Sequence, residues 1–312
     1  MTLTIASQWS EAANAGLGAR GLNVLPIPEG VPVDVPLQAQ VLLLAPPFQW
    51  GGRSAPKPPG WPFELRWIQL ATAGIDFFPD WLFEGPQVTS ARGVTADAIA
   101  EFALAAIFSA AKRLPDIWID DPAQWALSTL QRVGGTTFGL VGFGAIAQAL
   151  ARRALALGMR VVCVRRGPAP PEVDGVERAQ DLASLFAQSD HVVLAAPGTP
   201  ATQHLVNRAL LAQAKPGLHL INVARGSLID QDALLEALDG GRVALATLDV
   251  ATPEPLPAGH AFYTHPRVRL SPHTSPISPD TPQRLLAKFV ANLERYEAGL
   301  ALDDVADRAR GY

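Results

Sequence analysis

The sequence predicts an α/β protein whose larger part is a doubly wound parallel sheet, with a smaller α/β unit before it. Three observations support this fold class. From residue 136 onward, apolar runs without polar alternation recur with helical segments between them, as in parallel strands buried on both faces. Before residue 93, shorter apolar runs stand between Pro- and Gly-rich loops. The 312 residues exceed the usual length of one domain, which favours two.

The expected strands and helices follow in order along the chain. The N-terminal strands are LTIA, VLLLAPP, LRWIQLATAG and PQVTSARG. A buried helix, ADAIAEFALAAIFSAAKRL, begins after Thr95 as N-cap and ends at Pro115. The strands of the larger part are FGLVGFG, RVVCVRR, HVVLAAP, LHLINVARG, VALATLDV and VRLSPH. A last helix, PQRLLAKFVANLERYEAG, follows them.

Composition narrows the classes of function. A formal charge of −4 provides no basic surplus for coating nucleic acid, so no nucleic-acid partner is expected. No uncharged apolar stretch reaches roughly 18 residues, and the N-terminus lacks the pattern of a secretory signal. The single cysteine, Cys163, lies inside a predicted strand and fits a reducing compartment. We therefore expect a cytoplasmic protein without a membrane partner or a metal site.

A glycine motif follows the first strand of the larger part. Gly142, Gly144, Ala145, Ile146 and Ala147 fit a GxGxxA variant of the dinucleotide fingerprint, between a strand and a helix as it requires. The first glycine allows a tight turn, and the second lets the backbone approach a pyrophosphate at the helix N-terminus. Ala147 replaces a glycine that serves helix–strand packing, where a methyl group can fit. The motif predicts a Rossmann-type cofactor site; the alternative is a glycine turn without a ligand.

Two adjacent arginines, Arg165 and Arg166, end the second strand of this part. The fingerprint expects an acidic residue there, which binds the adenosine ribose. A guanidinium instead binds a 2′-phosphate through charge-assisted, often bidentate hydrogen bonds. The arginines therefore predict a preference for NADP(H), with NAD(H) as the other cofactor; the alternative is a solvated strand end.

Further polar residues stand at the carboxyl ends of the predicted strands, where doubly wound sheets bind ligands. These ends carry Pro197, Arg225, Asp249 and His273. Arg225 can bind a substrate carboxylate and polarise a carbonyl oxygen, and His273 can donate a proton to the new alkoxide. The set suits hydride transfer to a ketone beside a carboxylate. Structural roles for Arg225 and His273 are the alternatives, and we expect the other histidines to be structural.

Glu254 stands between two prolines in VATPEPLP and is a candidate partner for His273. A carboxylate that is hydrogen-bonded to an imidazole stabilises the charged ring and fixes its orientation. The alternative is an exposed loop glutamate. Sequence spacing leaves open whether the two side chains touch.

The chain resembles the D-isomer-specific 2-hydroxyacid dehydrogenases over nearly its whole length. The resemblance depends on ATAGID, AEFALAAIFSAAKRL, GLVGFGAIAQALARRALALGMRV, INVARGSLID, LDVATPEPLP and HPRVRLSPHTS, in the family's order. The tail VADRARGY and the two arginines are most similar to the glyoxylate/hydroxypyruvate reductase branch. The resemblance implies that Arg225, Glu254 and His273 take the family's catalytic roles. It also implies that the backbone amides of Ala73 and Gly74 hold the substrate carboxylate.

The resemblance further implies an organisation for the chain. Residues 1–95 and 285–312 would form a discontinuous, flavodoxin-like substrate domain, and residues 96–284 the dinucleotide-binding domain with a linker helix. Asp249 would lie near the nicotinamide carboxamide, and we expect Thr202 and Ala224 to line the cofactor site with Pro197. Family members are usually homodimers, so a homodimer is expected.

These inferences predict an NADPH-preferring reductase of small 2-oxo acids, such as glyoxylate or hydroxypyruvate, which makes D-2-hydroxy acids with His273 as proton donor. One alternative is an NAD(P)-sensing binding protein without physiological turnover. Another is an NAD-dependent dehydrogenase of a different substrate, such as 3-phosphoglycerate, formate or phosphite. Substrate size depends on loops 47–62, 73–77 and 116–130. Trp118 or Trp125 could line the cleft, although core packing is the favoured interpretation.

Overall fold

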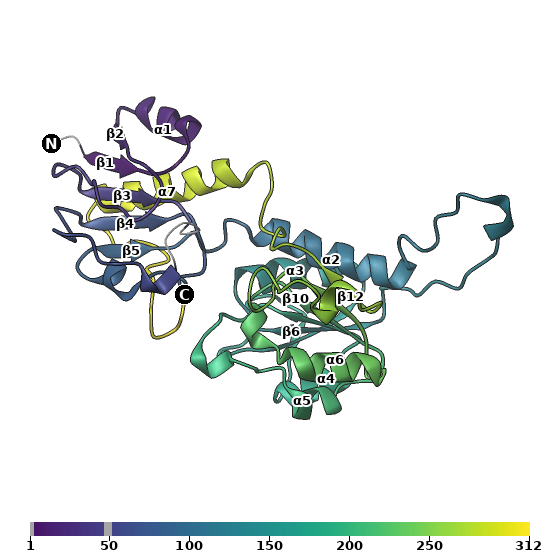
Figure 1. Cartoon of the computed structure of the whole chain (residues 1–312). Coiled ribbons are helices and arrows are strands. Elements are labelled where there is room, and N and C mark those ends of the chain that lie inside the picture. Colours follow the sequence, from purple (N-terminus) through teal and green to yellow (C-terminus); the bar gives the residue numbers. More distant parts are fainter. Residues whose placement is uncertain (1–2, 47–51) are drawn as a thin grey trace. The chain divides into compact units, whose positions relative to one another are not determined.

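The computed structural model describes residues 3–46 and 52–312, and the chain divides into two compact units (Figure 1). One unit contains Met1–Val94 and Ser278–Tyr312, and the other contains Thr95–Ile277. The first unit is therefore discontinuous in sequence, since the chain leaves it after Val94 and re-enters it at Ser278. The second boundary expected from the sequence, residue 285, lies later in the chain. Each unit has its own parallel sheet and its own hydrophobic clusters.

The discontinuous unit is built on a five-stranded parallel sheet in the order β2-β1-β3-β4-β5, which is the flavodoxin-like order. Its elements are β1 (Thr4–Ser7), α1 (Glu11–Gly18), β2 (Asn23–Pro26), β3 (Val41–Leu44), the 3-10 helix Gly52–Ser54, β4 (Trp67–Leu70), the 3-10 helix Asp80–Phe83, β5 (Gln87–Thr89) and α7 (Thr281–Glu297). The C-terminal helix α7 packs on this sheet through Phe289, whose ring stacks 5.0 Å from the fully buried ring of Trp67. This contact fixes the end of the chain to a strand from its first third.

The continuous unit has a seven-stranded sheet in the order β12-β11-β10-β9-β6-β7-β8, with every pair parallel. Its elements are α2 (Ala96–Lys112), the 3-10 helix Pro122–Gln124, β6 (Thr137–Val141), α3 (Ala145–Ala156), β7 (Arg160–Val164), β8 (Val176–Arg178), α4 (Leu182–Gln188), β9 (His191–Leu194), the 3-10 helix Pro200–Thr202, α5 (Arg208–Ala212), β10 (Leu218–Asn222), the 3-10 helix Gly226–Leu228, α6 (Gln231–Asp239), β11 (Val243–Leu248), the 3-10 helix Ala261–Tyr263 and β12 (Val268–Leu270). The strand order reverses between β6 and β9, and ligands of doubly wound sheets bind at such a switch point.

Alternate strand residues of this sheet face two separate cores. One cluster joins the strands to α4, α5 and α6, and the other joins them to α2 and α3 (Figure 1). Because both faces are covered, the strands read as unbroken apolar runs in the sequence. The predicted fold class, a Rossmann-type doubly wound sheet with a smaller flavodoxin-like unit, is confirmed.

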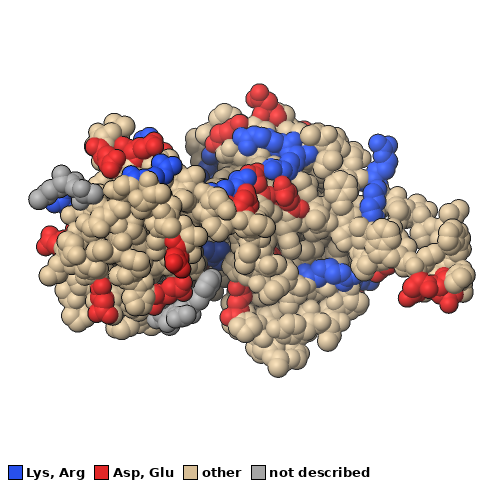
Figure 2. All heavy atoms as spheres, turned by 90° about the horizontal axis from the view of Figure 1, so that it is seen from above, with Lys and Arg blue, Asp and Glu red and all other residues tan. Residues whose placement is uncertain are grey.

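The helix expected from residue 96 is α2, which begins after Thr95 and ends where Arg113 takes a left-handed conformation at φ +52°. It buries the apolar face whose period the sequence shows. Among the described residues, no helix is both long and apolar enough to cross a membrane. On the face seen in Figure 2, acidic and basic side chains are interspersed over a largely uncharged surface.

Between α2 and β6 the chain forms an extended arm, residues 114–132, which Figure 1 shows reaching away from the sheet of its unit. The side chains of Trp118 and Trp125 are 70% and 82% exposed. Core packing of these tryptophans, the interpretation favoured from the sequence, is therefore wrong. The arm has only the short 3-10 helix Pro122–Gln124, so no regular face turns its apolar side chains toward a core.

Candidate active site

The turn after β6 requires glycine at residue 142. Gly142 has a φ of +93°, and its N–H donates to the carbonyl oxygen of Val164 at 2.8 Å. A Cβ atom there would lie 2.7 Å from the carbonyl oxygen of Ala195, too close for any side chain. Ala147, in place of the third glycine, is fully buried in the core formed with α2 and α3. Its methyl group therefore fits the helix–strand contact.

The residues after this turn fit a dinucleotide. Helix α3 begins at Ala145 with Gly144 at its N-cap, and no side chain caps its first turn. Its first amide groups therefore need another acceptor, and their N–H groups with the helix dipole favour an anion such as a pyrophosphate. Ala145 and Ile146 are half-buried in this first turn. Among the described residues, no group of three or more His, Cys, Asp or Glu is arranged to hold a metal ion.

Arg165 and Arg166 lie just beyond the carboxyl end of β7. The Arg165 side chain is 20% exposed, and its Nη1 donates to Glu172 Oε1 at 2.6 Å and to the Pro170 carbonyl oxygen at 3.2 Å. Arg166 is exposed in the same turn. The first arginine of the expected phosphate site therefore already has an anionic partner from its own loop.

A third arginine, Arg178, ends the neighbouring strand β8 beside them. It pairs in register with Cys163 of β7, and its guanidinium donates to the carbonyl oxygens of Arg165 and Ala169, each at 3.4 Å. Sequence reasoning missed Arg178 because β8 has only three residues, two of them charged, and shows no strand pattern. Arg165, Arg166 and Arg178 thus lie together at one corner of the sheet edge, which we call the arginine corner.

Arg225 lies after β10 in a loop that is locked to its neighbours. Its carbonyl oxygen accepts a hydrogen bond from Asn222 Nδ2 at 2.8 Å, and its Nη1 donates to the Ala224 carbonyl oxygen at 2.8 Å. A Cβ atom on Gly226 would lie 2.0 Å from the carbonyl carbon of Ala251. The loop that carries Arg225 therefore packs directly on the loop after β11, and only glycine permits this approach.

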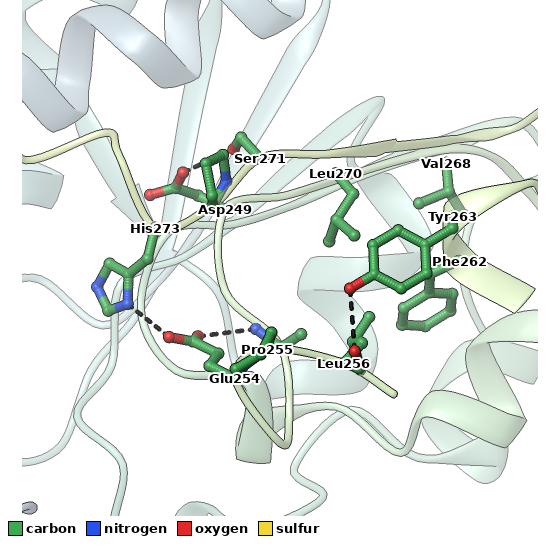
Figure 3. Close-up of a pocket in the computed structure, with 12 residues that line it drawn as sticks. Asp249, Glu254, Pro255, Leu256, Phe262, Tyr263, Val268, Leu270, Ser271 and His273 are labelled. Atoms are coloured by element: carbon green, nitrogen blue, oxygen red, sulfur yellow. Dashed lines mark hydrogen bonds and ion pairs between the residues drawn. The ribbon is translucent and has the colours of Figure 1, made fainter. Parts of the chain in front are cut away.

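His273 and Glu254 form a direct pair at the carboxyl edge of β11 and β12 (Figure 3). His273 Nδ1 donates to Glu254 Oε2 at 2.8 Å, and the Ala251 amide donates to Glu254 Oε1 at 2.9 Å. The two side chains are 41% and 40% exposed. Since Nδ1 faces the carboxylate, Nε2 is the ring nitrogen directed away from it.

The Glu254 carboxylate stays ionised in this position. Burial alone would raise the pKa of Glu254, but the hydrogen bonds from His273 and from the Ala251 amide lower it. The positive charge of Arg225 acts in the same direction, and the pKa of Glu254 lies below its ordinary value. Arg225 therefore influences the same carboxylate that holds His273.

Asp249 fixes the turn that carries His273. Its carboxylate, in a residue only 1% exposed, accepts hydrogen bonds from Ser271 Oγ at 2.6 Å and from the amides of Thr274 and Ser275 at 2.9 and 3.0 Å. The Asp249 carbonyl oxygen accepts a hydrogen bond from the His273 amide at 2.8 Å, and His273 has a left-handed φ of +51°. Sequence reasoning expected Asp249 beside the nicotinamide and missed this network, because two of its three donors to the carboxylate are backbone amides, which carry no sequence signal.

The remaining expected cofactor residues lie in loops at the same edge. Thr202 Oγ1 donates to the Pro197 carbonyl oxygen at 2.7 Å, which stabilises the loop after β9. Ala224 is buried, and its amide donates to Asn222 Oδ1 at 3.1 Å. These bonds are local, so contact of Pro197, Thr202 and Ala224 with a cofactor stays a prediction.

Ala73 and Gly74 lie in the discontinuous unit, in the loop after β4. Ala73 is exposed, and the Gly74 carbonyl oxygen accepts a hydrogen bond from Thr72 Oγ1 at 2.9 Å. The structure thus brings Asp249, Glu254 and His273 together in one unit and places the expected carboxylate-binding amides in the other. Of the loop expected over residues 47–62, residues 47–51 lie outside the described part of the chain.

A cavity of about 420 Å³ lies beside the His273–Glu254 pair (Figure 3). Apolar side chains line most of it, among them Leu256, Phe262 and Leu270. Glu254, His273 and Asp249 also line this cavity.

The fold and this glycine turn define a dinucleotide-binding protein, and the comparisons with known proteins give its family. The family description "D-isomer specific 2-hydroxyacid dehydrogenase, NAD binding domain" matches residues 104–275. Glyoxylate/hydroxypyruvate reductase A of Serratia proteamaculans is 33% identical over 221 residues, covering 70% of this chain and 69% of that protein. Hydroxypyruvate reductase of Thermotoga maritima is 37% identical over 175 residues, covering 55% of this chain and 56% of that relative.

A solved structure agrees over the full length. The D-isomer specific 2-hydroxyacid dehydrogenase of Xanthobacter autotrophicus, crystallised with NADPH and MES, superposes with a TM-score of 0.83 at 27% identity, and covers 100% of both chains. The chain belongs to the D-isomer-specific 2-hydroxyacid dehydrogenase family, an NAD(P)-dependent group of oxidoreductases. The resemblance found in the sequence is confirmed.

Proposed function

We propose that this protein is an NADPH-preferring reductase of small 2-oxo acids, of the glyoxylate and hydroxypyruvate type, and forms D-2-hydroxy acids. The observation that carries the proposal is the 2.8 Å hydrogen bond between His273 and Glu254 at the ligand-binding edge of the sheet. The names of the Serratia and Thermotoga relatives support the substrate class. The alignments cover 69% and 56% of those proteins, so the substrate assignment needs its own test.

In this proposal His273 is the proton donor. Glu254 accepts from Nδ1, so the proton to be delivered sits on Nε2, which is directed away from the carboxylate. The ionised Glu254 stabilises the protonated ring and prevents its rotation. A nicotinamide dinucleotide, with its pyrophosphate held at the glycine turn, would supply the hydride that the carbonyl carbon accepts. His273 then delivers its proton to the carbonyl oxygen, which has gained negative charge.

Arg225 would bind the substrate carboxylate, the role that the sequence resemblance also gives to the backbone amides of Ala73 and Gly74. A guanidinium matches a carboxylate in shape and charge, and it also stabilises negative charge on the neighbouring carbonyl oxygen. The Arg225 loop is held by Asn222 and by its close packing at Gly226, so the guanidinium starts from a fixed backbone. Orientation of the substrate by a fixed cation favours attack on one face and hence one isomer.

The preference for NADPH is proposed from the arginine corner. Arg165, Arg166 and Arg178 end two adjacent strands, at the position where the fingerprint places the adenosine ribose. Guanidinium groups bind a phosphate with charge-assisted hydrogen bonds, whereas a neutral 2′-hydroxyl gains no charge-assisted hydrogen bond from them. The positive charge therefore favours the phosphorylated cofactor.

A steady-state assay tests this function. Glyoxylate and hydroxypyruvate are each supplied with NADPH and with NADH at neutral pH, and chiral analysis identifies the product. We expect turnover with both acids, a D-hydroxy acid from hydroxypyruvate, and a kcat/KM for NADPH roughly tenfold or more above that for NADH. Equal or better efficiency with NADH would overturn the cofactor preference. No turnover with either acid would overturn the substrate class.

We also propose that the protein is a homodimer that uses the arm of residues 114–132. The arm exposes Trp118, Ile119, Trp125 and Leu127, and a cluster of large apolar side chains on a surface is typical of a protein interface. Light scattering after size exclusion should give twice the chain mass. A monomer at micromolar concentration would contradict the proposal.

A further inference from the structure

The proposed 2′-phosphate site contains a carboxylate of its own. Glu172 lies in the loop between β7 and β8, and its Oε1 accepts from Arg165 Nη1 at 2.6 Å. The Arg165 side chain is 20% exposed, and that of Glu172 is 46% exposed. The ion pair therefore lies at the solvent boundary, where an incoming anion can reach it.

The loop holds Glu172 in a defined place. The next residue, Val173, is 7% exposed and packs in the core formed with α2 and α3. On the other side of Glu172, the Pro170 carbonyl oxygen also accepts from Arg165, and the Ala169 carbonyl oxygen accepts from Arg178. Because the residues on both sides of Glu172 are held by these contacts, the loop directs the Glu172 carboxylate toward Arg165.

A carboxylate in this position opposes a phosphate. A 2′-phosphate carries more negative charge than a carboxylate and seeks the same guanidinium donors. Glu172 must therefore give up part of its contact with Arg165 when the phosphate binds, and the two anions then repel each other at short range. A ribose 2′-hydroxyl has no charge and does not incur this repulsion.

We propose that Glu172 is a specificity-determining residue that competes with the 2′-phosphate for Arg165 and so limits the preference for NADP(H) over NAD(H). This inference rests on the proposed binding of the 2′-phosphate by Arg165. Without the phosphate, Glu172 neutralises the guanidinium; with it, the carboxylate is displaced. The pair thereby leaves the protein able to accept both cofactors while favouring one.

Direct binding measurements on the whole protein test this without turnover. Isothermal titration calorimetry measures the affinity for adenosine 2′,5′-bisphosphate and for adenosine 5′-monophosphate, which differ only in the 2′-phosphate. The test variant is Glu172→Gln. The matched control is Glu177→Gln on β8, which removes the same charge from an arginine ion pair of 2.5 Å with Arg160 at the opposite end of β7. Arg165→Gln tests the underlying phosphate site.

We expect Glu172→Gln to bind the bisphosphate roughly three- to tenfold more tightly than the natural protein, with the monophosphate unchanged. Glu177→Gln should change neither affinity, and Arg165→Gln should weaken the bisphosphate alone. If Glu172→Gln fails to tighten the bisphosphate while Arg165→Gln weakens it, the inference is overturned and the phosphate site stands. If Arg165→Gln has no effect, the proposed cofactor preference is overturned together with the inference.

Discussion

The continuous unit contains two side-chain pairs that include histidine, one of His with Glu and one of His with His. They belong to the same sheet but differ in the histidine's partner and in burial. His273 lies at the carboxyl edge, is 41% exposed in its side chain and is hydrogen-bonded to Glu254. His191 and His219 lie on β9 and β10, are 9% and 3% exposed, and contact each other through their Nδ1 atoms at 3.3 Å. The second ring nitrogen of His219 is bonded to Thr247 Oγ1 at 2.9 Å.

The difference shows that environment, rather than residue type, decides what a histidine does. Burial lowers the pKa of His191 to about 4, although Asp190 raises it and Lys215 lowers it further. Burial and the neighbouring His191 lower the pKa of His219 to about 3. Both rings are therefore neutral near pH 7 and cannot serve as charged proton donors. His273, by contrast, has a counter-charge in Glu254 and a ring nitrogen that faces away from it.

The largest expected effect follows from removing His273. His273→Gln should lower kcat roughly 10²- to 10⁴-fold, because the developing alkoxide loses its proton donor. The affinity for NADPH, measured by quenching of protein fluorescence, should stay the same.

An exposed histidine outside the site provides the control for this variant. His204 also has a positive φ, of +49°, which asparagine adopts readily, so His204→Asn should leave kcat unchanged. A His273→Gln enzyme within about threefold of the natural kcat would contradict the proton-donor role. His273 would then have no catalytic role, like the buried His191 and His219.

The buried pair should instead determine stability in mild acid. Its pKa values lie below the ordinary 6.5, so the unfolded chain takes up protons first as pH falls. The stabilisation is complete above about pH 6.5 and is lost as the pH falls, toward about 4 for His191 and about 3 for His219; down to pH 4 the loss is on the order of 3 kcal/mol per histidine. Urea unfolding at pH 7.5, 6.5, 5.5 and 4.5 measures this loss.

A variant separates this loss from that of other acid-sensitive groups. Asp190 faces His191 and is paired with Lys215 at 2.6 Å, but its pKa is lowered from 3.8, so its contribution disappears only at more acidic pH. His219→Gln should reduce the dependence of the unfolding free energy on pH between 6.5 and 4.5, even if it destabilises the fold. An identical slope in the variant would show that the buried pair is not the cause.

Most of the fold could be predicted because its signals are local. Apolar runs mark the strands buried on both faces, and Gly142 is fixed by a turn that no other residue can form. The pairing of His273 with Glu254 was predicted from chemistry, and the structure places the two side chains in contact. The assignment of His191 and His219 to structural roles agrees with their burial.

What could not be predicted depends on contacts between distant or irregular segments. Strand β8 exists because it pairs with β7, and this pairing brings Arg178 to the arginine corner. The ion pair of Arg165 with Glu172 depends on the shape of one loop. Trp125 resembles a core residue in composition, yet the arm offers it nothing to pack on within its unit.

The smallest expected effect distinguishes two roles for Asp249. Asp249→Asn replaces one acceptor oxygen with an NH₂ group, which is only a donor. The two carboxylate oxygens that accept separately from the Thr274 and Ser275 amides are then no longer both present. The left-handed turn at His273 loses support, so kcat should fall roughly tenfold, while the affinity for NADPH changes less than about twofold. Ser271→Ala removes only one donor to the carboxylate and should cost about threefold.

The split between kcat and cofactor affinity decides the interpretation of Asp249. A residue that positions His273 affects the proton transfer step, and its loss should also change the pH profile of kcat. A residue that binds the nicotinamide directly affects cofactor affinity first. If Asp249→Asn weakens NADPH binding tenfold and leaves kcat intact, the carboxylate serves the cofactor, and the turn at His273 is held by the hydrogen bonds of the His273 amide to the carbonyl oxygens of Asp249 and Ser271.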